Sequence, residues 1–348
     1  MDGHPVVERL ALGEFSDLPQ WQRVQAHFAT VLGIALRTLS PQRHLLTEAS
    51  WPSGVDADRT IRLLKIGEEL DQLVPLDDLP QEISQLTTLL GVTYAAVPIR
   101  ATPTQLVAYF VLGPVVVGLR EQQEAFRSRM KAVGIDPDPL WSVLLSMKQY
   151  TFTGLRSVLT LLEEVGNAMA QLAYQTKHLE AIIPDATKIN QALRTYYVNR
   201  LFQSLLETAT TATKAEGGSI LVYDSNLEAF RINAAQGLSE DVVNTTRVKR
   251  GEGIAGLVAQ EPRILLIDET VNDPRLRACL RRPDLTSSLV APLMAESVAE
   301  PIGVLNLRTR DPSKRFTEEH VLLLQKLLEL AGIALGSLQV SRRGRPAS

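Results

Sequence analysis

The sequence predicts an α/β (α+β) protein of two modules, each an antiparallel sheet flanked by helices, joined by long helices prone to form a coiled coil. The chain has 348 residues, more than the usual single domain of about 100–200 residues. Strand-rich segments occur in both halves, and an apolar repeat of helical spacing separates them. We expect a tail at 1–13, a first module at 14–153, a helical linker at 154–195, a second module at 196–338 and a basic tail at 339–348.

The central helical segment between Gly154 and Pro184 carries apolar side chains at alternating steps of four and three, the spacing of a coiled-coil seam. These are Val158, Leu162, Val165, Met169, Leu172, Thr176, Leu179 and Ile183. The alternative is one amphipathic helix packed on its own domain. Pro184 has no N–H for a helix interior, so it should end this helix and make the junction a hinge, with Asp185 capping a separate second helix.

Composition excludes several functions. Hydrophobic residues make up 45% and charged residues 22% of the chain, as in ordinary globular proteins. A net charge of −3 gives no overall attraction to nucleic acid or to an anionic membrane. The longest apolar run, 106–119, is too short to span a bilayer, and the first residues do not form a signal peptide. We expect a cytoplasmic protein with no membrane segment and no nucleic-acid partner.

Metal and cofactor chemistry have no support in the residue pattern. The five histidines are scattered, with no pair at a metal-ligand spacing such as i, i+4. The single cysteine, Cys279, excludes a disulfide within the chain and a cysteine-rich zinc site. Several arginines near Cys279 could favour its thiolate, but a small apolar residue on a short helix is the simpler interpretation. We expect no metal and no cofactor, apart from a small ligand of unknown identity.

In the first module, apolar spacing predicts a helix from Leu18 that ends at Gly33, followed by a strand at 34–39. A turn and a short strand at 45–49 should follow, then helices at 58–70 and 80–90. Two apolar, β-rich runs at 92–100 and 106–117 predict a hairpin of central strands. Helical spacing resumes at 122–133 and after Pro139.

This succession resembles the PocR sensory domain, a PAS-like ligand-binding module. The resemblance covers residues 16–175 and is carried by "LLTEASW", "YAAVPI" and "VAYFVLGPV". It implies a pocket with the candidate residues Trp51, Tyr94, Val97 and Tyr109. Comparable members often carry several cysteines in this region, and none stands here. Cysteine-based sensing is therefore not expected, which leaves small-molecule binding or dimerisation.

In the second module, a helix should run from 185 to 215 and stop at Gly217-Gly218. A hairpin of 219–224 and 228–236 follows, and a last helix begins after Thr317, a suitable N-cap. The segments "GEGIAGLVA", "ILLID", "NDPRL", "SSLVAPL" and "IGVLNL" closely resemble a GAF domain over residues 196–338. The resemblance implies a six-stranded antiparallel sheet with helices on both faces and a ligand pocket on one side.

Position in the GAF pattern gives the pocket candidates, for which ordinary core packing is the equal alternative. They are Ser219, Leu221, Tyr223, Ile254, Leu257, Asp273, Arg275, Ser287 and Ser288. In GAF proteins the last helix pairs with the first, and both commonly join a dimer bundle. The dimer seam would then combine the central helix with the last one, through Val158, Leu162, Val165, Met169, Leu172, Leu324, Leu328 and Leu335.

Three specific motifs fail in context. Residues 251–256 read G-x-G-x-x-G, but a dinucleotide fold needs an apolar strand directly before the glycines, and 242–250 is polar and charged. The glycines are better explained as turn and close-packing positions. GAF domains that bind cyclic nucleotides carry the signature N-K…F-x-x-x-D-E. Here Leu307 follows Asn306 in place of the lysine, and His320 and Val321 follow Phe316 in place of the two acids. A bilin-binding cysteine is followed by histidine, whereas Leu280 follows Cys279.

The sequence therefore predicts a non-enzymatic signalling or regulatory protein. A small ligand in the GAF or the PocR-like pocket would shift the packing of the helices in a homodimer. A separate effector, such as a kinase, a cyclase or a transcription regulator, would receive the signal. The alternative is a dimerisation and docking scaffold with vestigial pockets. A GAF-based enzyme of the methionine sulfoxide reductase kind would need more than one cysteine.

Overall fold

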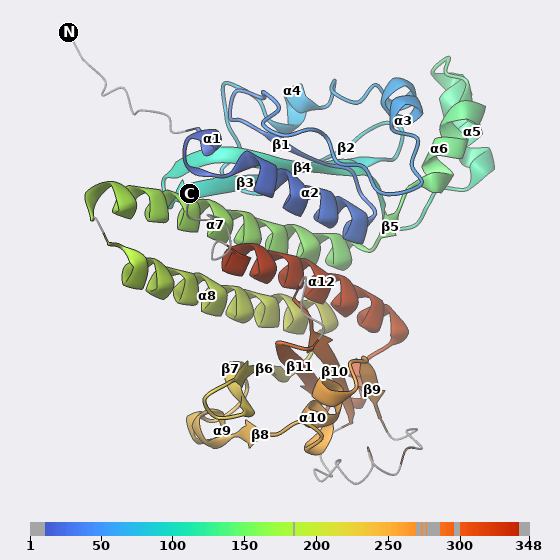
Figure 1. The fold of residues 1–348 in the computed structure, drawn as a ribbon. Coiled ribbons are helices and arrows are strands. Elements are labelled where there is room, and N and C mark those ends of the chain that lie inside the picture. Colours follow the sequence, from blue (N-terminus) through green and yellow to red (C-terminus); the bar gives the residue numbers. More distant parts are fainter. Residues whose placement is uncertain are drawn as a thin grey trace. The chain divides into compact units, whose positions relative to one another are not determined.

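The computed structural model describes residues 11–183, 185–268, 273, 276, 286–295 and 300–340, and of residues 339 and 340 it describes the backbone only. The chain divides into two compact units, Met1–Ala186 and Thr187–Ser348 (Figure 1). The expected helical linker 154–195 is thus divided, because its first part packs on the sheet of the first unit. Pro184 lies outside the described residues, but the helices on either side of it are separate elements.

The first unit is a five-stranded sheet with helices on both faces (Figure 1). Its strands run antiparallel in the order β1-β4-β3-β2, and β5 pairs with β4 in parallel. The elements are α1 (Leu12–Phe15), α2 (Leu18–Leu32), β1 (Leu36–Leu39), α3 (Ala57–Leu64), α4 (Leu70–Leu73), β2 (Ser84–Thr87), β3 (Thr93–Thr102), β4 (Gln105–Val117), α5 (Gln123–Ala132), α6 (Pro137–Ser146), β5 (Gln149–Tyr150) and α7 (Phe152–Ile182).

The predicted central hairpin is formed by β3 and β4, with Val97 opposite Phe110 and Pro98 opposite Tyr109. Because side chains alternate along a strand, the hairpin builds two cores. On one face Phe110 packs against Trp21 of α2 and lies beside Gly166 of α7. On the other face Tyr109 joins the core built with α3, α4, α5 and α6.

Two elements of the first unit differ from the sequence prediction. Residues 45–49 do not form a strand: Leu45 makes an isolated bridge with Leu39, and Ser50, just after the segment, makes one with Leu36. Residues 84–87, expected within a helix, form strand β2 at the sheet edge. The partner strand decides this outcome, since Ser84–Thr87 pair with residues of β3 and pairing overrides a weak local preference. The expected tail 1–13 is also shorter, because Leu12 is buried in α1, which packs on α7.

Helix ends in the first unit follow from local chemistry. The Asp17 side chain accepts a hydrogen bond from the backbone N–H of Gln20, which caps the start of α2. The predicted stop at Gly33 is confirmed, since this residue has the left-handed φ of 66° that glycine adopts without a steric penalty. Thr151 caps α7 through its hydroxyl, which accepts from Gly154 N at 3.0 Å.

The second unit is a six-stranded antiparallel sheet in the order β8-β7-β6-β11-β10-β9, as the GAF resemblance predicts. Helices α8 and α12 pack on one face and α10 on the other (Figure 1). The elements are α8 (Thr187–Thr213), β6 (Gly217–Asp224), β7 (Ala229–Gln236), α9 (Glu240–Thr245), β8 (Arg247–Val248), α10 (Gly253–Gln260), β9 (Leu265–Ile267), β10 (Ser287–Leu293), β11 (Gly303–Thr309), the 3-10 turn Pro312–Lys314 and α12 (Glu318–Val340).

The prediction that Gly217 and Gly218 stop the first helix of this unit is wrong. Helix α8 ends at Thr213, and Lys214 takes the left-handed conformation with φ 55°. Both glycines lie inside β6, where a Cβ on Gly218 would come within 2.6 Å of the Asn306 carbonyl oxygen. These glycines are therefore used for close strand packing and not as a helix stop.

Helix α12 over Glu318–Leu338 is long and apolar enough, by length and composition, to pass a test for a membrane span. The same test is passed by core helices of domains without a membrane. Here α12 packs on α8 and β10, and 56% of its most apolar window is buried. Its apolar side chains are thus explained by the core of the second unit.

Candidate functional site

The sheet face beneath α10 is where the GAF resemblance places a ligand. A turn positions this helix: the N–H of Gly251 donates to the Gly256 carbonyl at 2.8 Å, and Gly251 has a φ of 77°. A Cβ on Gly256 would overlap the Lys249 carbonyl oxygen. The G-x-G-x-x-G glycines are thus turn and close-packing positions. Helix α10 then covers an apolar cluster that includes Leu221, Val258 and Val290.

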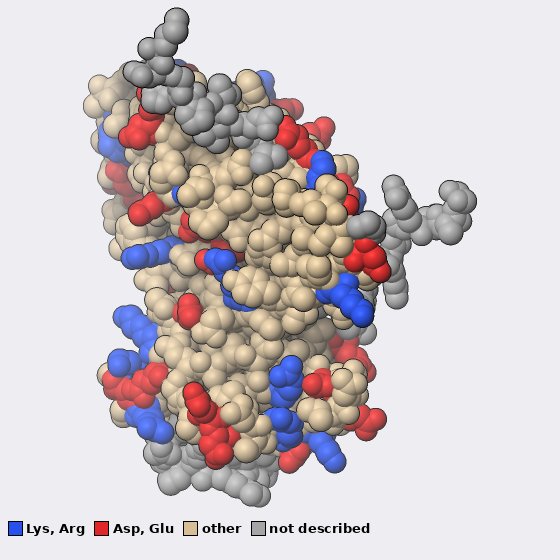
Figure 2. Space-filling model, turned by 90° about the vertical axis from the view of Figure 1, so that its left-hand side faces the viewer, with Lys and Arg blue, Asp and Glu red and all other residues tan. Residues whose placement is uncertain are grey.

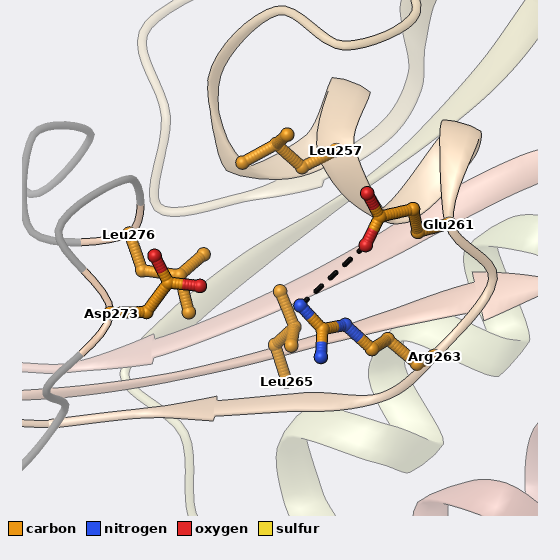
Figure 3. A pocket seen from close by; sticks show the side chains of 6 residues that line it. All are labelled: Leu257, Glu261, Arg263, Leu265, Asp273 and Leu276. Atoms are coloured by element: carbon orange, nitrogen blue, oxygen red, sulfur yellow. Dashed lines mark ion pairs between the residues drawn. The ribbon is translucent and has the colours of Figure 1, made fainter.

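A small cavity lies at the end of α10, between this helix and β9 (Figure 3). It is lined by Leu257, Glu261, Arg263, Leu265, Asp273 and Leu276. Its volume of about 10 Å³ is what one water molecule needs. In this conformation the cavity holds no larger ligand.

Charged side chains flank this cavity. Arg263 and Glu261 form a loose ion pair, with 3.7 Å between nitrogen and oxygen, and both side chains are about half exposed. Such a pair contributes at most about 1 kcal/mol, because water screens it. Asp273 lies across the cavity from Arg263 (Figure 3). The rim can therefore offer both a cation and a carboxylate to a polar group.

The structure brings together only part of the predicted GAF pocket. Leu257 and Asp273 line the small cavity, and Leu221 and Ile254 belong to the apolar cluster beside it. Ser219 and Tyr223 alternate with Ile220 and Val222 on β6, so they share the side of Leu221.

The two predicted serines of β10 cannot face the same pocket. Ser288 shares the side of Val290, and its neighbour Ser287 points to the opposite face of the sheet. The Ser287 hydroxyl is buried without a hydrogen-bond partner among the described residues. Arg275 lies outside the described residues, as does Cys279. The role of these positions in ligand binding stays a prediction.

Arg250 is a site residue that the sequence reasoning missed. Its guanidinium lies 5.4 Å from the ring centre of Tyr223 and 5.6 Å from that of Phe230. It also donates to the carboxylate of Glu300 at 2.8 Å and to the Ala259 carbonyl at 2.9 Å. Arg250 thus ties the end of α10 to the β6–β7 hairpin. The sequence offers little indication of this role, because Arg250 follows polar and charged residues that are typical of a solvent-exposed turn.

Arg263, Glu261 and Leu265 were also missed, whereas Leu276 ends the turn from Asp273 that the GAF pattern places at the pocket. Leu265 lies within the quoted segment "ILLID", and Glu261 and Arg263 lie just before it. Among the residues that the structure describes, no group of three His, Cys, Asp or Glu side chains lies close enough together to hold a metal ion.

Acidic and basic side chains are interspersed over the face drawn in Figure 2, with no large region of one sign.

The predicted pocket of the first unit is divided between the two faces of its sheet. Tyr94 and Tyr109 are fully buried in the core with α5 and α6, whereas Val97 faces α2 and α7. Trp51 is half-buried in the segment after β1. These four side chains do not form one cluster.

A polar group lies within this buried core. The guanidinium of Arg37 pairs with the Glu69 carboxylate at 3.0 Å, and both side chains are largely buried. The Tyr94 hydroxyl is buried without a partner among the described residues. Burial raises the pKa of Tyr94 far above its usual range, and the Glu69 charge adds to this while Arg37 opposes it. Burial also raises the pKa of Tyr109 to about 12, and its hydroxyl donates to the Pro80 carbonyl at 2.9 Å.

The predicted dimer seam is mostly buried in the single chain. The buried members are Val158, Leu162, Val165, Leu172, Leu324, Leu328 and Leu335, and Met169 is half-buried. Part of α7 packs on its own sheet, where Asn167 and Gly166 contact β3. The seam and its alternative, a helix packed on its own domain, both stay predictions.

Residues 198–336 match the family model described as the GAF domain. Among solved structures, the GAF domain of a phosphoenolpyruvate-protein phosphotransferase from Acinetobacter is 21% identical, over 40% of this chain and 81% of that chain, with a TM-score of 0.34. The free methionine-R-sulfoxide reductase from Neisseria meningitidis, in complex with its substrate, is 14% identical over 55% and 95%, with a TM-score of 0.38.

A fragment of a methyl-accepting chemotaxis protein, residues 122 to 287, is 17% identical over 42% of this chain and 93% of that fragment, with a TM-score of 0.36. The match to the family model thus assigns residues 198–336 of the second unit to a GAF domain.

Proposed function

We propose that this protein is a non-enzymatic cytoplasmic regulator that binds a small ligand and relays its presence to a partner protein through its helices. The observation that carries the proposal is the GAF domain itself, in which α10 covers one face of the sheet while α8 and α12 pack on the other. Strand β10 contacts both α10 and α12. A ligand that moves α10 would therefore displace a strand on which α12 rests.

The mechanism is a shift between two packings of the helices. A ligand changes this equilibrium only by the difference between its affinities for the two states. The partner, a kinase, a cyclase or a transcription regulator, would bind the helices of one state in a homodimer. Neither step needs a reaction at the ligand site, so the proposal assigns no catalytic residue.

The first unit is proposed as a second sensory module, similar to PocR. The support is its antiparallel sheet flanked by helices and the buried polar group formed by Arg37, Glu69 and Tyr94. A buried hydroxyl without a partner carries a desolvation cost of about 1–3 kcal/mol. A ligand atom that accepts from the Tyr94 hydroxyl would remove this cost.

A scaffold without ligand is the second candidate, and the small cavity favours it. About 10 Å³ under α10 leaves room for a water molecule and nothing more. In this case both units would serve for dimerisation and docking, with a vestigial pocket in the GAF domain.

Hydrogen exchange separates the two candidates. The protein is incubated with the small-molecule extract of the cells that make it, and amide exchange is compared with and without the extract. A sensor should gain protection in α10 and also in α12, since a relay needs both faces to respond. A scaffold should show unchanged exchange in both helices.

A further inference from the structure

A pocket of about 420 Å³ lies in the second unit beside α12. This volume is within the range of about 300–1,000 Å³ that is typical of ligand pockets. Three segments line it: the residues between α10 and β9, the end of β10 with the residue after it, and one face of α12. The lining residues are Pro262, Arg263, Ile264, Pro292, Met294, Val321, Gln325, Leu328 and Glu329. All of them belong to the second unit.

The packing of α12 leaves this space open. A Cβ on Gly332 would overlap the Met294 carbonyl oxygen, so at Gly332 the helix lies directly against the chain at the end of β10. Earlier in the helix, Leu328 borders the pocket instead. Strand β9 begins only at Leu265, so Ile264 has no partner in the β9–β10 ladder. The pocket is thus a gap between the first half of α12 and the edge of the sheet.

One face of α12 forms a wall of the pocket. Val321, Gln325, Leu328 and Glu329 follow each other at i, i+4, i+7 and i+8, the spacing of a single helical stripe. Leu328 is buried and Val321 is half-buried, whereas Gln325 and Glu329 are exposed. Together with the half-buried Ile264 they give the pocket an apolar interior and a polar edge.

The polar edge carries a negative charge. Glu329 accepts a hydrogen bond from the Gln325 amide at 2.9 Å, which orients its carboxylate. In the part of the chain that the structure describes, this carboxylate has no ion pair. Lys326, the nearest cation along α12, is half-buried and has an interaction with another group. The edge therefore offers acceptors that a ligand can use.

Arg263 lines the pocket as well, but its guanidinium belongs to the other side of β9. Figure 3 shows the side chain extending toward Glu261 at the small cavity, where the charged groups are 3.7 Å apart. Leu265 lines the same small cavity, whereas Ile264, between these two residues, lines the larger pocket. The sign of the charge at the larger pocket is thus set by Glu329.

We propose that this pocket is a second ligand site and that it takes a primary amine with a compact apolar body. The ammonium lies at the edge, where it donates to the Glu329 carboxylate and to the side-chain carbonyl of Gln325. The body packs against Ile264, Val321 and Leu328.

The edge and the walls select this class together. An ammonium has three donors and no acceptor, which matches an edge of acceptors. A fatty acid would place its carboxylate beside Glu329, where like charges repel. A sugar or a nucleotide would set polar groups against apolar walls, and such groups cost free energy when they lose their hydrogen bonds. A neutral apolar molecule fits the walls but leaves the acceptors of the edge unused.

Such a ligand would contact α12 directly. The site therefore goes beyond the proposed function, in which a ligand under α10 reaches α12 only through β10. It stands or falls separately, because a ligand bound elsewhere would still make the protein a sensor.

The test uses the full chain with 2-phenylethylamine as the probe in isothermal titration calorimetry at neutral pH, where the amine is charged. Two analogues keep the apolar body: 2-phenylethanol is neutral, and 3-phenylpropanoate is an anion. We expect one amine to bind per chain, and the alcohol to bind about three- to fivefold more weakly, since water screens an exposed charge pair. The carboxylate should bind at least about tenfold more weakly than the amine, because attraction becomes repulsion. Equal binding of the amine and the carboxylate contradicts the proposal.

Charge reversal at the edge locates the ammonium. Glu329 is exposed, so its replacement does not disturb the core. Glu329→Gln should bring the amine to the affinity of the alcohol, and Glu329→Lys should reverse the order of the amine and the carboxylate. An order that Glu329→Lys leaves unchanged shows that the ammonium does not lie beside Glu329 and overturns the proposal.

The matched control for the charge reversal is Glu207→Lys on α8. Glu207 is exposed and accepts a hydrogen bond at 2.9 Å from Gln203, a glutamine four positions before it, as Glu329 does from Gln325. It does not line the pocket, so Glu207→Lys should keep the order of the wild type. A reversal in this variant too would mean that net charge, not the pocket, decides the order.

Filling the pocket tests the place of the apolar body. Val321→Trp should abolish binding of all three probes. Leu322→Trp adds the same side chain at the next position, which is 62% exposed and outside the lining, and should leave binding unchanged. The charge reversal decides the matter if tryptophan at position 321 prevents folding. No saturable binding of the amine to the wild type at millimolar concentration, or binding that survives in Val321→Trp, rules the site out.

Discussion

The backbone N–H of Arg100 donates a hydrogen bond to the side-chain oxygen of Asn167 at 2.8 Å, which joins β3 to α7 across 67 positions of sequence. The β3–β4 register shifts on both sides of Arg100, between Ile99 and Arg100 and again before Thr102. The ladder is irregular at this point, and Asn167, itself largely buried, supplies an acceptor for the Arg100 N–H.

We predict that Asn167→Ala lowers the free energy of unfolding of the first unit by about 1–3 kcal/mol, because the partly buried N–H of Arg100 loses its partner. Asn167→Asp keeps an acceptor and should cost less. Tryptophan fluorescence in urea measures this unit alone, since Trp21, Trp51 and Trp141 all precede residue 187. Equal stability of the alanine variant and the wild type would show that the hydrogen bond contributes nothing.

Gly166 makes the second contact of α7 with the sheet. A Cβ at this position would overlap Cδ1 of Ile99, which is fully buried, and would lie 3.1 Å from the Phe110 ring. Gly166→Ala should therefore destabilise the first unit by about 1–3 kcal/mol through overpacking, less the gain of about 1 kcal/mol in helix propensity. Ile99→Val removes the methyl group that is overlapped. The double variant should regain most of the loss by the same fluorescence measurement, and no rescue would place the strain elsewhere.

His320 makes the stability of the second unit depend on pH. Its Nδ1 accepts from the backbone N–H of Thr317 at 3.1 Å, at the start of α12. Burial lowers the pKa of His320, with Lys214 adding to this and Glu319 opposing it. The folded state therefore binds the proton less readily than the unfolded state. Stability is full above the ordinary value near 6.5 and falls as pH drops from there toward the folded pKa.

His320→Gln tests this relation, because glutamine at the third helical position can also accept from the capping residue but does not titrate. The variant should keep the stability of α12 and lose that part of its pH dependence between about pH 7 and pH 5. His320→Ala should lose both. Calorimetric unfolding at a series of pH values measures the effect. An unchanged pH dependence in the glutamine variant would exclude His320 as the cause.

We predict that the protein is a homodimer. Met169 is a half-buried seam residue of α7, so Met169→Lys should produce monomer in light scattering. Thr160→Lys, at an exposed position of the same helix, is the matched control and should stay dimeric. Leu162 is unsuitable for this test because it is fully buried, and lysine there would unfold the unit. A dimeric Met169→Lys variant with unchanged tryptophan fluorescence would contradict the seam.

Long periodic helices and the β3–β4 hairpin could be predicted from the sequence because each is specified by local pattern, whereas the six-stranded sheet was predicted from the resemblance to a GAF domain. The strand at Ser84–Thr87 could not, since only its pairing with β3 makes it a strand. Gly217 and Gly218 were misread because a glycine pair fits a helix end as well as close strand packing.

The candidate sites were less predictable than the fold. Position in the family pattern found Leu257 and Asp273, but strand alternation places Ser287 and Ser288 on opposite faces. Arg263 was not predicted, because only the fold of the segment between α10 and β9 brings its guanidinium beside Glu261 at the small cavity.

Native mass spectrometry of the protein purified from the cells that make it tests the central claim most directly. A sensor should retain its ligand, so we predict a chain mass raised by that of a small molecule, which returns to the sequence mass of 38.3 kDa on denaturation. The bare mass of the chain or of its dimer in every preparation would contradict ligand sensing and favour the scaffold.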